Sequence, residues 1–297
     1  MDRQEDLQRT VAPASTDGKR RFTFEEMDLR GEIVRADTLL DEVNAIHDYP
    51  AGVARLLGEF IAASVLLAST LKFRGSLTVQ ARSDGEIPLI MAECSSDLTV
   101  RAIARGAQAA KSEDFRALLG GGQLVLTVTP ERGNRYQGIV PLDDASLAAS
   151  IDAYFAQSEQ LQTRLYLACD GDRAAGLLLQ QLPAQRVMDE ARRDEQWQRV
   201  GLLADTIEAA ELLTLPEERI LFRLFNEEVV RLYDRESVRF RCSCSQDRTL
   251  AALAAIGEAE IRSILDEQGS ITMDCEFCNQ RYVFREGDLR GLIDPPP

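Results

Sequence analysis

The chain has 297 residues, of which 45% are hydrophobic and 28% charged, as expected for a soluble globular protein of one to three domains. Its formal net charge of −15 argues against a protein that neutralises nucleic-acid phosphates. No apolar signal segment opens the sequence, and its richest apolar stretch, residues 60–71, is too short and interrupted to predict a membrane span. Four of the cysteines are clustered, unlike the spread framework of a secreted domain. We expect a cytoplasmic protein with neither a membrane nor a nucleic acid as partner.

The first 182 residues predict a tail followed by an α+β domain. Residues 1–21 are polar and lack hydrophobic periodicity, which predicts a disordered tail. Within residues 22–182, helices are expected at 37–46, 51–72 and 145–157. Alternating apolar residues between glycine-rich turns predict a mostly antiparallel sheet. The expected strands are 28–36, 77–79, 87–93, 98–104, 123–129, 135–140, 163–169 and 173–181.

Three potentially reactive residues in this domain have ordinary structural interpretations. His47 is the only histidine and has no cysteine near it in the sequence, which favours a turn or capping role over a metal ligand or catalytic base. Cys94 and Cys169 fall in or beside strand patterns, which predicts small, buried core residues. No nucleophile motif accompanies His47, so we find no catalytic constellation and expect a protein that is not an enzyme.

Residues 183–235 are dense in charges of both signs and predict a helical linker. The helical pattern runs from residue 184 to about 233. One of its apolar stripes consists of Trp197, Val200, Leu203 and Ile207. This stripe is either the packed face of an ordinary surface helix or an interaction surface on a metastable linker. In the second interpretation the stripe is covered while the following domain is folded and exposed when it is not.

Residues 236–285 contain four of the six cysteines and predict a small zinc-binding domain. The cysteines form a Cys-x-Cys pair and, 30 residues later, a Cys-x-x-Cys pair: Cys242, Cys244, Cys275 and Cys278. Two short-spaced pairs of thiolates supply the four ligands of a tetrahedral zinc site. A helical pattern broken at Gly257 and a short strand at 271–273 let the chain fold back between the pairs. Residues 286–297 form an acidic tail to which we assign no function.

The Cys-x-Cys spacing leaves two interpretations of the zinc site open. A single intervening residue makes a tight chelate and also places two sulfurs close enough to consider a bond between them. The zinc is either a permanent structural ion or part of a redox switch, because thiolates are the form that oxidants attack, and oxidation to two disulfides would eject the metal. Structural zinc contributes on the order of 10 kcal/mol or more to folding, so ejection would unfold so small a module.

Four arginines lie close to these cysteines in the sequence: Arg239, Arg241, Arg248 and Arg281. A zinc ion with four thiolates carries a formal charge of −2. We hypothesise that some of these arginines offset that charge and raise thiolate reactivity. The alternative is that they are ordinary solvated side chains.

Two cysteine motifs and several further segments resemble the heat shock protein 33 family of redox-regulated holdase chaperones. The motifs are Phe240-x-Cys242-Ser243-Cys244-Ser245 and Cys275-Glu276-Phe277-Cys278-Asn279. The supporting segments span nearly the whole chain and are His47-Asp48-Tyr49-Pro50, Arg135 to Leu142, Tyr154-Phe155-x-x-Ser158-Glu159-Gln160 and Leu224 to Glu228. One departure is Asn226, where we expect a histidine in the family.

The resemblance implies a chaperone that works without ATP. In its reduced, inactive form one Zn²⁺ per chain is expected on Cys242, Cys244, Cys275 and Cys278. Oxidant together with heat is expected to form the disulfides Cys242–Cys244 and Cys275–Cys278 and to release the zinc. The zinc module and the linker then unfold and bind unfolding client proteins, and active members of the family form homodimers. The candidate client-binding residues are Trp197, Val200, Leu203 and Ile207.

Two other functions remain as alternatives. A thiol–disulfide oxidoreductase uses a Cys-x-x-Cys pair whose first cysteine lies at a helix N-terminus. Here strand-like residues flank Cys275 and Cys278 on both sides, which favours a metal knuckle. The second alternative is a purely structural zinc-ribbon interaction module.

Overall fold

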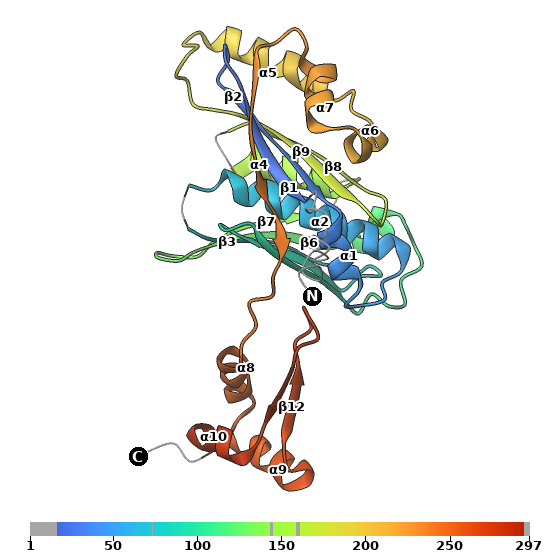
Figure 1. Ribbon diagram of the computed structural model, residues 1–297, viewed down its shortest axis with the longest axis vertical. Coiled ribbons are helices and arrows are strands. Elements are labelled where there is room, and N and C mark those ends of the chain that lie inside the picture. Colours follow the sequence, from blue (N-terminus) through green and yellow to red (C-terminus); the bar gives the residue numbers. More distant parts are fainter. Residues whose placement is uncertain (1–16, 73, 143–144, 159–160, 294–297) are drawn as a thin grey trace, which may run out of the picture. The chain divides into compact units, whose positions relative to one another are not determined.

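The computed structural model describes residues 17–72, 74–142, 145–158 and 161–293. Within this part the chain forms two compact units (Figure 1). The larger unit extends to residue 240 but leaves out residues 45–47, and the smaller unit combines those three residues with residues from 241 onward. The α+β class predicted from the sequence is confirmed, because both units combine helices with antiparallel strands.

A six-stranded sheet forms one layer of the larger unit. Its strand order is β11-β5-β4-β3-β6-β7, and all neighbours are antiparallel except β11 and β5. The strands are β3 (Gly75–Arg82), β4 (Leu89–Ser95), β5 (Thr99–Arg105), β6 (Gln123–Pro130), β7 (Tyr136–Pro141) and β11 (Arg239–Phe240). A short helix, α3 (Phe115–Leu119), precedes β6.

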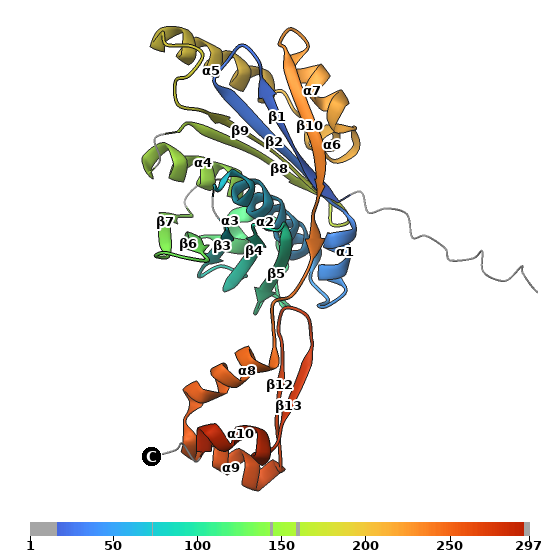
Figure 2. The same cartoon turned by 60° about the vertical axis from the view of Figure 1, so that its left-hand side comes forward.

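A five-stranded antiparallel sheet forms a second layer of the same unit. Its strand order is β10-β1-β2-β9-β8. The strands are β1 (Gly18–Phe24), β2 (Leu29–Ala36), β8 (Thr163–Cys169), β9 (Ala174–Gln181) and β10 (Val230–Ser237). Helices α1 (Thr38–Asn44), α2 (Ala51–Thr70) and α4 (Leu147–Ser158) belong to this unit too. Helices α2 and α4 each contact strands of both sheets, so they form a helical layer between them (Figure 2).

Helix α2 carries much of the core between the two sheets. It is long and apolar enough to cross a membrane by length and composition, with a mean hydropathy of 1.7 over its most apolar window. However, 78% of that window is buried inside the domain. A helix that is apolar on all sides is expected where sheets cover both of its faces. We therefore interpret α2 as a core helix.

Residues 18–21, which the sequence places in a disordered tail, instead begin strand β1. The charged residues of this segment give no apolar strand pattern in the sequence. Two of them pair with the fully buried Glu32 on β2. The Nζ atom of Lys19 lies 3.4 Å from Oε2 of Glu32, and Nε of Arg21 lies 2.7 Å from Oε1. A pattern based on hydrophobicity counts such residues as exposed, although pairing allows them to be buried. The rest of the predicted tail, residues 1–16, lies outside the described residues.

The predicted helical linker, residues 183–235, is only partly helical. Helices α5 (Glu190–Ala204), α6 (Ala209–Thr214) and α7 (Glu217–Phe225) lie on the face of the five-stranded sheet that is turned away from α2 (Figure 1). Residues 230–233 were predicted to be helical, but they belong to strand β10, which pairs with β1. Val230 and Leu232, on alternating positions of β10, pack against the apolar cluster beneath the helices. Pairing with the open edge of β1 thus makes residues 230–233 a strand, which the local sequence pattern did not predict.

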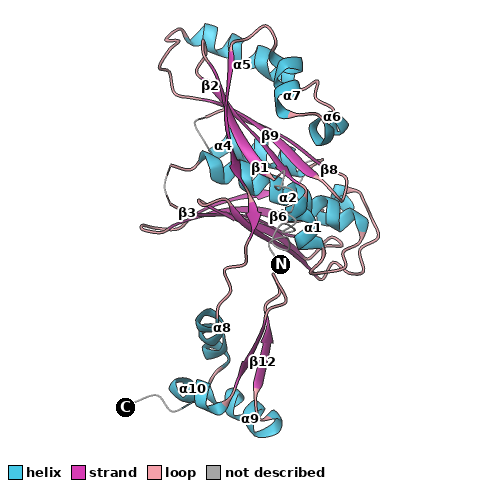
Figure 3. Ribbon diagram, in the orientation of Figure 1, coloured by secondary structure: helices cyan, strands magenta, loops and turns pink. Residues whose placement is uncertain are grey.

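The smaller unit has an apolar core of its own, formed by Leu253, Ile261, Ile271, Phe284, Leu289 and Ile293. Its elements are α8 (Gln246–Leu253), the 3₁₀ turn η1 (Ala254–Ile256), α9 (Glu258–Gln268), β12 (Ile271–Asp274), β13 (Arg281–Phe284) and α10 (Glu286–Ile293) (Figure 3). Gly257 and Gly269 have φ angles of 90° and 72°, which confirms the predicted breaks. Helix α10 corrects the prediction of a tail from residue 286, since its apolar side chains complete this core. Residues 294–297 lie outside the described residues.

Candidate metal centre

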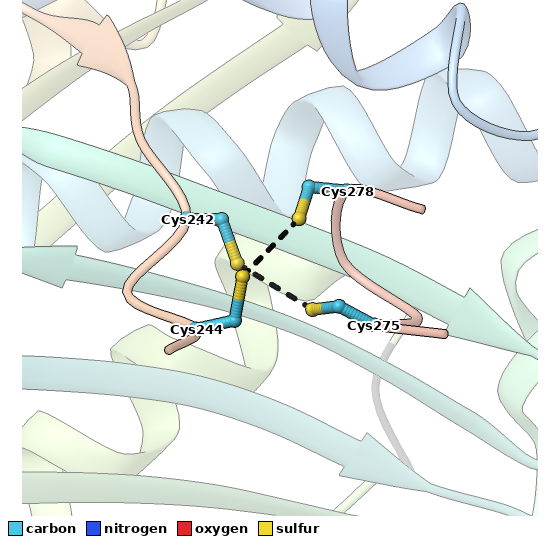
Figure 4. A group of neighbouring side chains, drawn as sticks. All are labelled: Cys242, Cys244, Cys275 and Cys278. Atoms are coloured by element: carbon cyan, nitrogen blue, oxygen red, sulfur yellow. Dashed lines mark hydrogen bonds between the residues drawn. The ribbon is translucent and has the colours of Figure 1, made fainter. Parts of the chain in front are cut away.

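The four cysteines of the smaller unit come from two segments that its fold brings together (Figure 4). Cys242 and Cys244 lie in the extended segment that leads into α8. Cys275 and Cys278 lie in the turn between β12 and β13. All four side chains converge on one point (Figure 4). The hairpin and the segment before α8 therefore build a single cluster of sulfur atoms.

Main-chain hydrogen bonds shape the turn of the Cys-x-x-Cys pair. The N–H of Cys275 donates to the carbonyl of Gln280 over 2.9 Å. The carbonyl of Cys275 accepts from the N–H groups of Cys278 and Asn279 over 3.2 and 2.7 Å. Asn279 has a positive φ of 54°, a conformation that asparagine tolerates better than most residues. This tight turn directs both sulfurs toward the other pair.

The spacing of the sulfurs fits a single tetrahedral ion. The Sγ atoms of Cys242 and Cys275 lie 3.6 Å apart, those of Cys244 and Cys278 lie 3.5 Å apart, and all four lie within 4.8 Å of one another. Disulfide sulfurs are about 2.05 Å apart, so these cysteines are free thiols. Ligand bonds of about 2.3 Å to a tetrahedral ion separate sulfurs by about 3.8 Å. The four cysteines could therefore hold one metal ion.

Burial and mutual contact affect how readily three of the clustered thiols ionise. Burial raises the pKa of Cys242, and burial together with hydrogen bonds to the neighbouring thiols raises the pKa of Cys278. Burial also opposes ionisation of Cys244, but hydrogen bonds from Tyr282 and from the other three thiols lower its pKa. The first negative charge is thus favoured at Cys244, and each further thiolate would meet like charge at close range. A bound cation would remove that repulsion.

Tyr282 belongs to the site although the sequence analysis did not single it out. Its hydroxyl donates a hydrogen bond to the Sγ atom of Cys244 over 3.2 Å, and this bond raises the pKa of Tyr282 to about 12. The alternation of side chains along strand β13 could have identified Tyr282. Tyr282 shares a face of β13 with the buried Phe284, so it points into the module rather than into solvent.

Two of the four arginines near the cysteines have defined partners. Arg281 forms a bidentate ion pair with Asp274, with distances of 2.8 and 2.9 Å. Arg248 donates to the carbonyl and the hydroxyl of Ser243 over 2.8 and 2.7 Å, which orders the loop of the Cys-x-Cys pair. The charge of Arg281 is already neutralised, so it offers little compensation to the sulfurs. Charge compensation stays a hypothesis for Arg239, Arg241 and Arg248.

Comparison with known proteins identifies the family. The family model described as Hsp33 protein matches residues 17–285, which is most of the chain. The chain belongs to the Hsp33 family. The 33 kDa chaperonin of Pseudomonas paraeruginosa is 50% identical over 281 residues, covering 94% of this chain and 95% of the relative. That of Pseudomonas syringae pv. tomato is 48% identical over 280 residues, covering 93% of each.

A solved structure supports the assignment at the level of the fold. The 33 kDa chaperonin (heat shock protein 33 homolog) from Thermotoga maritima matches with a TM-score of 0.77 and covers 93% of this chain and 98% of its own. Its sequence identity of 20% makes this a likeness of fold alone. The resemblance to the heat shock protein 33 family, inferred from the cysteine motifs and supporting segments, is confirmed.

The other candidate residues of this Hsp33-family chain lie in the larger unit. Trp197 and Val200, on α5, are buried in the cluster formed by the helices and the five-stranded sheet, and Leu203 and Ile207 pack partly against that cluster. The stripe is therefore buried at Trp197 and Val200 and partly covered at Leu203 and Ile207 in this structure. Both interpretations of the stripe are compatible with a covered face, and its role in client binding stays a prediction.

The remaining cysteines and His47 lie outside the sulfur cluster. Cys94 is fully buried, as predicted, and burial raises its pKa to about 12. Cys169 is half-buried beside Gly58, and burial raises its pKa to about 12 as well. The His47 ring forms a hydrogen bond with the main-chain carbonyl of Glu276 over 2.6 Å. This contact fits the structural role that the sequence predicts for His47.

Proposed function

We propose that this Hsp33-family chain is a redox-regulated, ATP-independent holdase chaperone of the cytoplasm. The observation that carries the proposal is the cluster of four free thiols within 4.8 Å of one another, in a chain whose relatives are named 33 kDa chaperonins. The reduced protein would be the inactive form. Oxidative stress together with heat would convert it into a form that binds unfolding client proteins.

Zinc is the metal that best suits the site. Four sulfur donors in tetrahedral array are typical of zinc or of iron–sulfur clusters, and the spacing supports a mononuclear ion. When bound, one Zn²⁺ would hold Cys242, Cys244, Cys275 and Cys278 as thiolates. The small core of the module, six buried apolar side chains, would then depend on the metal for much of its stability. Metal occupancy would in this way set whether the module is folded.

The proposed switch converts four thiolates into two disulfides. Each disulfide forms as two sulfurs bond and give two electrons to one hydrogen peroxide, which takes up two protons and leaves as two waters. Two peroxides per chain would therefore produce Cys242–Cys244 and Cys275–Cys278 and free the Zn²⁺. This pairing rests on the family resemblance. In the folded cluster, sulfur contacts of 3.6 and 3.5 Å join cysteines of different pairs, Cys242 to Cys275 and Cys244 to Cys278.

Loss of the metal would unfold the module and then loosen residues 183–235. The stripe of Trp197, Val200, Leu203 and Ile207 would become exposed and offer an apolar surface to clients. A net charge of −15 would help such a protein to stay soluble while it carries them. A homodimer is proposed as the active form, on the family resemblance.

The enzymatic alternative, a thiol–disulfide oxidoreductase, is less well supported. Its first cysteine would gain reactivity from the N-terminus of a helix. Cys275 instead follows strand β12 and begins a hairpin turn, and Cys278 is followed by strand β13. The purely structural alternative differs from our proposal in one respect, because its metal would remain bound when the protein meets an oxidant.

The deciding experiment measures zinc content and suppression of client aggregation on the same sample, before and after peroxide at raised temperature. We expect about one zinc per reduced chain and no protection, then zinc release and protection without ATP. A Cys94→Ala, Cys169→Ala double variant is the matched control and should behave as the wild type. Zinc that stays bound, or leaves without a gain in protection, would make the site structural and place the function elsewhere.

A further inference from the structure

A cavity of about 700 Å³ opens on the larger unit, and none of its lining residues belongs to the smaller unit. Its lining residues come from the C-terminal end of α2, from strands β3 and β6 and from helix α4, among other segments. Its walls are mostly apolar and include Leu67, Leu71, Leu77, Leu126, Val128 and Phe155. Pockets that take small organic ligands have volumes of about 300–1,000 Å³ and a mainly apolar lining. The cavity therefore has the size and lining of a ligand site.

Among the described residues, the charged side chains that line this cavity are all basic. Arg30, Lys72 and Arg132 contribute to its wall, and no acidic side chain does so among the described residues. The chain as a whole has 49 acidic and 34 basic residues, so a cavity with only basic groups runs against its composition. A positive cavity in an acidic protein favours an anionic ligand.

Arg30 is the cation that the fold holds in place. Its Nε and Nη2 atoms donate to the Oε1 atom of Gln180 over 3.1 and 2.5 Å. Gln180 is buried and donates in turn to the hydroxyl of Thr163 over 3.0 Å. Arg30 itself is half-buried and makes no ion pair within the described residues. Among the described residues the carboxylate of Glu32 acts on this guanidinium without forming an ion pair with it, so the charge of Arg30 is only partly offset.

We propose that the cavity binds an unbranched aliphatic carboxylate, such as a medium-chain fatty acid. Its carboxylate would pair with the guanidinium of Arg30, whose planar fork suits two parallel hydrogen bonds to carboxylate oxygens. Its alkyl chain would cover the leucine-rich wall. This site is independent of the cysteine cluster and goes beyond the proposed chaperone function.

Calorimetric titration of the reduced, full-length protein with dodecanoate, below its critical micelle concentration, tests the proposal. We expect one saturable site per chain and at least tenfold weaker binding of dodecan-1-ol, which keeps the chain but lacks the charge. Arg30→Gln should weaken dodecanoate binding about tenfold, equivalent to about 1.4 kcal/mol. Arg82→Gln is the matched control, because this exposed arginine on β3 does not line the cavity, and it should leave binding unchanged.

The location of the ligand needs a second measurement. Val128→Trp would fill the cavity from β6 and should abolish dodecanoate binding while the thermal unfolding transition is retained. A photoreactive analogue of dodecanoate should label peptides of α2 or β6 in the wild type, which locates the site even if Val128→Trp does not fold. Equal affinity for acid and alcohol, undiminished binding by Arg30→Gln, labelling elsewhere, or no saturable binding would each overturn the proposal.

Discussion

The hydroxyl of Tyr282 donates a hydrogen bond to the sulfur of Cys244 over 3.2 Å. This contact links strand β13, beyond the Cys-x-x-Cys turn, to a cysteine of the other pair. A hydroxyl that donates to a ligand thiolate stabilises its negative charge and fixes its orientation. Tyr282 is therefore positioned to support metal binding without being a ligand itself.

Replacing Tyr282 with phenylalanine removes this hydrogen bond and keeps the ring. Loss of such supporting contacts typically lowers metal affinity by about 10–100-fold, so we expect Tyr282→Phe to bind zinc at least tenfold more weakly. Competition with a chromogenic chelator measures the change. Tyr233→Phe, on β10 of the larger unit, should have no effect. Equal zinc affinity in wild type and Tyr282→Phe would show that the contact does not support the site.

The six cysteines should differ sharply in their reaction with an alkylating agent. Burial raises the pKa of Cys94 and of Cys169 to about 12, so at pH 8 only roughly one such thiol in ten thousand is ionised. With a zinc chelator present, the proposed unfolding of the metal-free module would expose Cys242, Cys244, Cys275 and Cys278. Iodoacetamide should then modify these four and spare the other two until denaturant is added. Mass spectrometry of the digested protein identifies which cysteines have been modified. Early modification of Cys94 would contradict the burial of its thiol.

The carboxylate of Glu217, on helix α7, forms an ion pair with Arg235 on strand β10. The Nη2 atom of Arg235 lies 2.5 Å from both carboxylate oxygens, and the Glu217 side chain is only 4% exposed. Glu217→Gln removes the charge of this buried carboxylate, whose partner Arg235 is exposed, and should lower the free energy of unfolding by about 2 kcal/mol. If residues 183–235 are the metastable linker that we propose, the variant should also need less heat for activation.

Hydrogen exchange and denaturant unfolding check this expectation. Exchange in α7 and β10 should be faster in Glu217→Gln than in the wild type. Glu195→Gln is the matched control, because Glu195 pairs with Arg199 on the exposed face of α5, where ion pairs contribute little. If both variants lose the same stability, the buried carboxylate of Glu217 has no special role.

Glu59, on the buried helix α2, should make the stability of the protein depend on pH. Burial raises its pKa to about 7, although the charge of Arg55 opposes this shift. Because the pKa is higher in the folded state than the usual value of 4.5, folding favours the protonated form. The stability associated with Glu59 is present below about pH 4.5 and is lost as the pH rises to about 7.

The variant Glu59→Gln isolates this contribution, because glutamine has nearly the same shape and does not ionise. Wild type and variant should have similar free energies of unfolding near pH 4.5, and the variant should be the more stable above pH 7. Urea unfolding at both pH values measures the difference. A difference between the two proteins that does not change with pH would mean that Glu59 titrates normally.

Local patterns predicted most elements of the larger unit but failed where charged residues are buried. The alternation at 28–36 and the apolar run at 51–72 correspond to β2 and α2. Strand β1 was missed because Lys19 and Arg21 look exposed by composition, whereas pairing with the buried Glu32 allows Lys19 to be buried and Arg21 to be partly buried. Strand β10 was predicted to be helical, because its conformation depends on the edge of β1, some 200 residues away in the sequence.

The sequence by itself determined the residues of the candidate metal site. Cysteine spacing is a local property, and the chemistry of thiols restricts what four of them in two close pairs can do. Tertiary structure decided how the sulfurs meet, that Tyr282 touches Cys244, and that Arg30 lines an apolar cavity with Gln180 as its partner. These relationships join residues that are distant in the chain, and their energies depend on burial and distance. Burial and the distances between such residues exist only in the folded chain, so a pattern in the sequence cannot supply them.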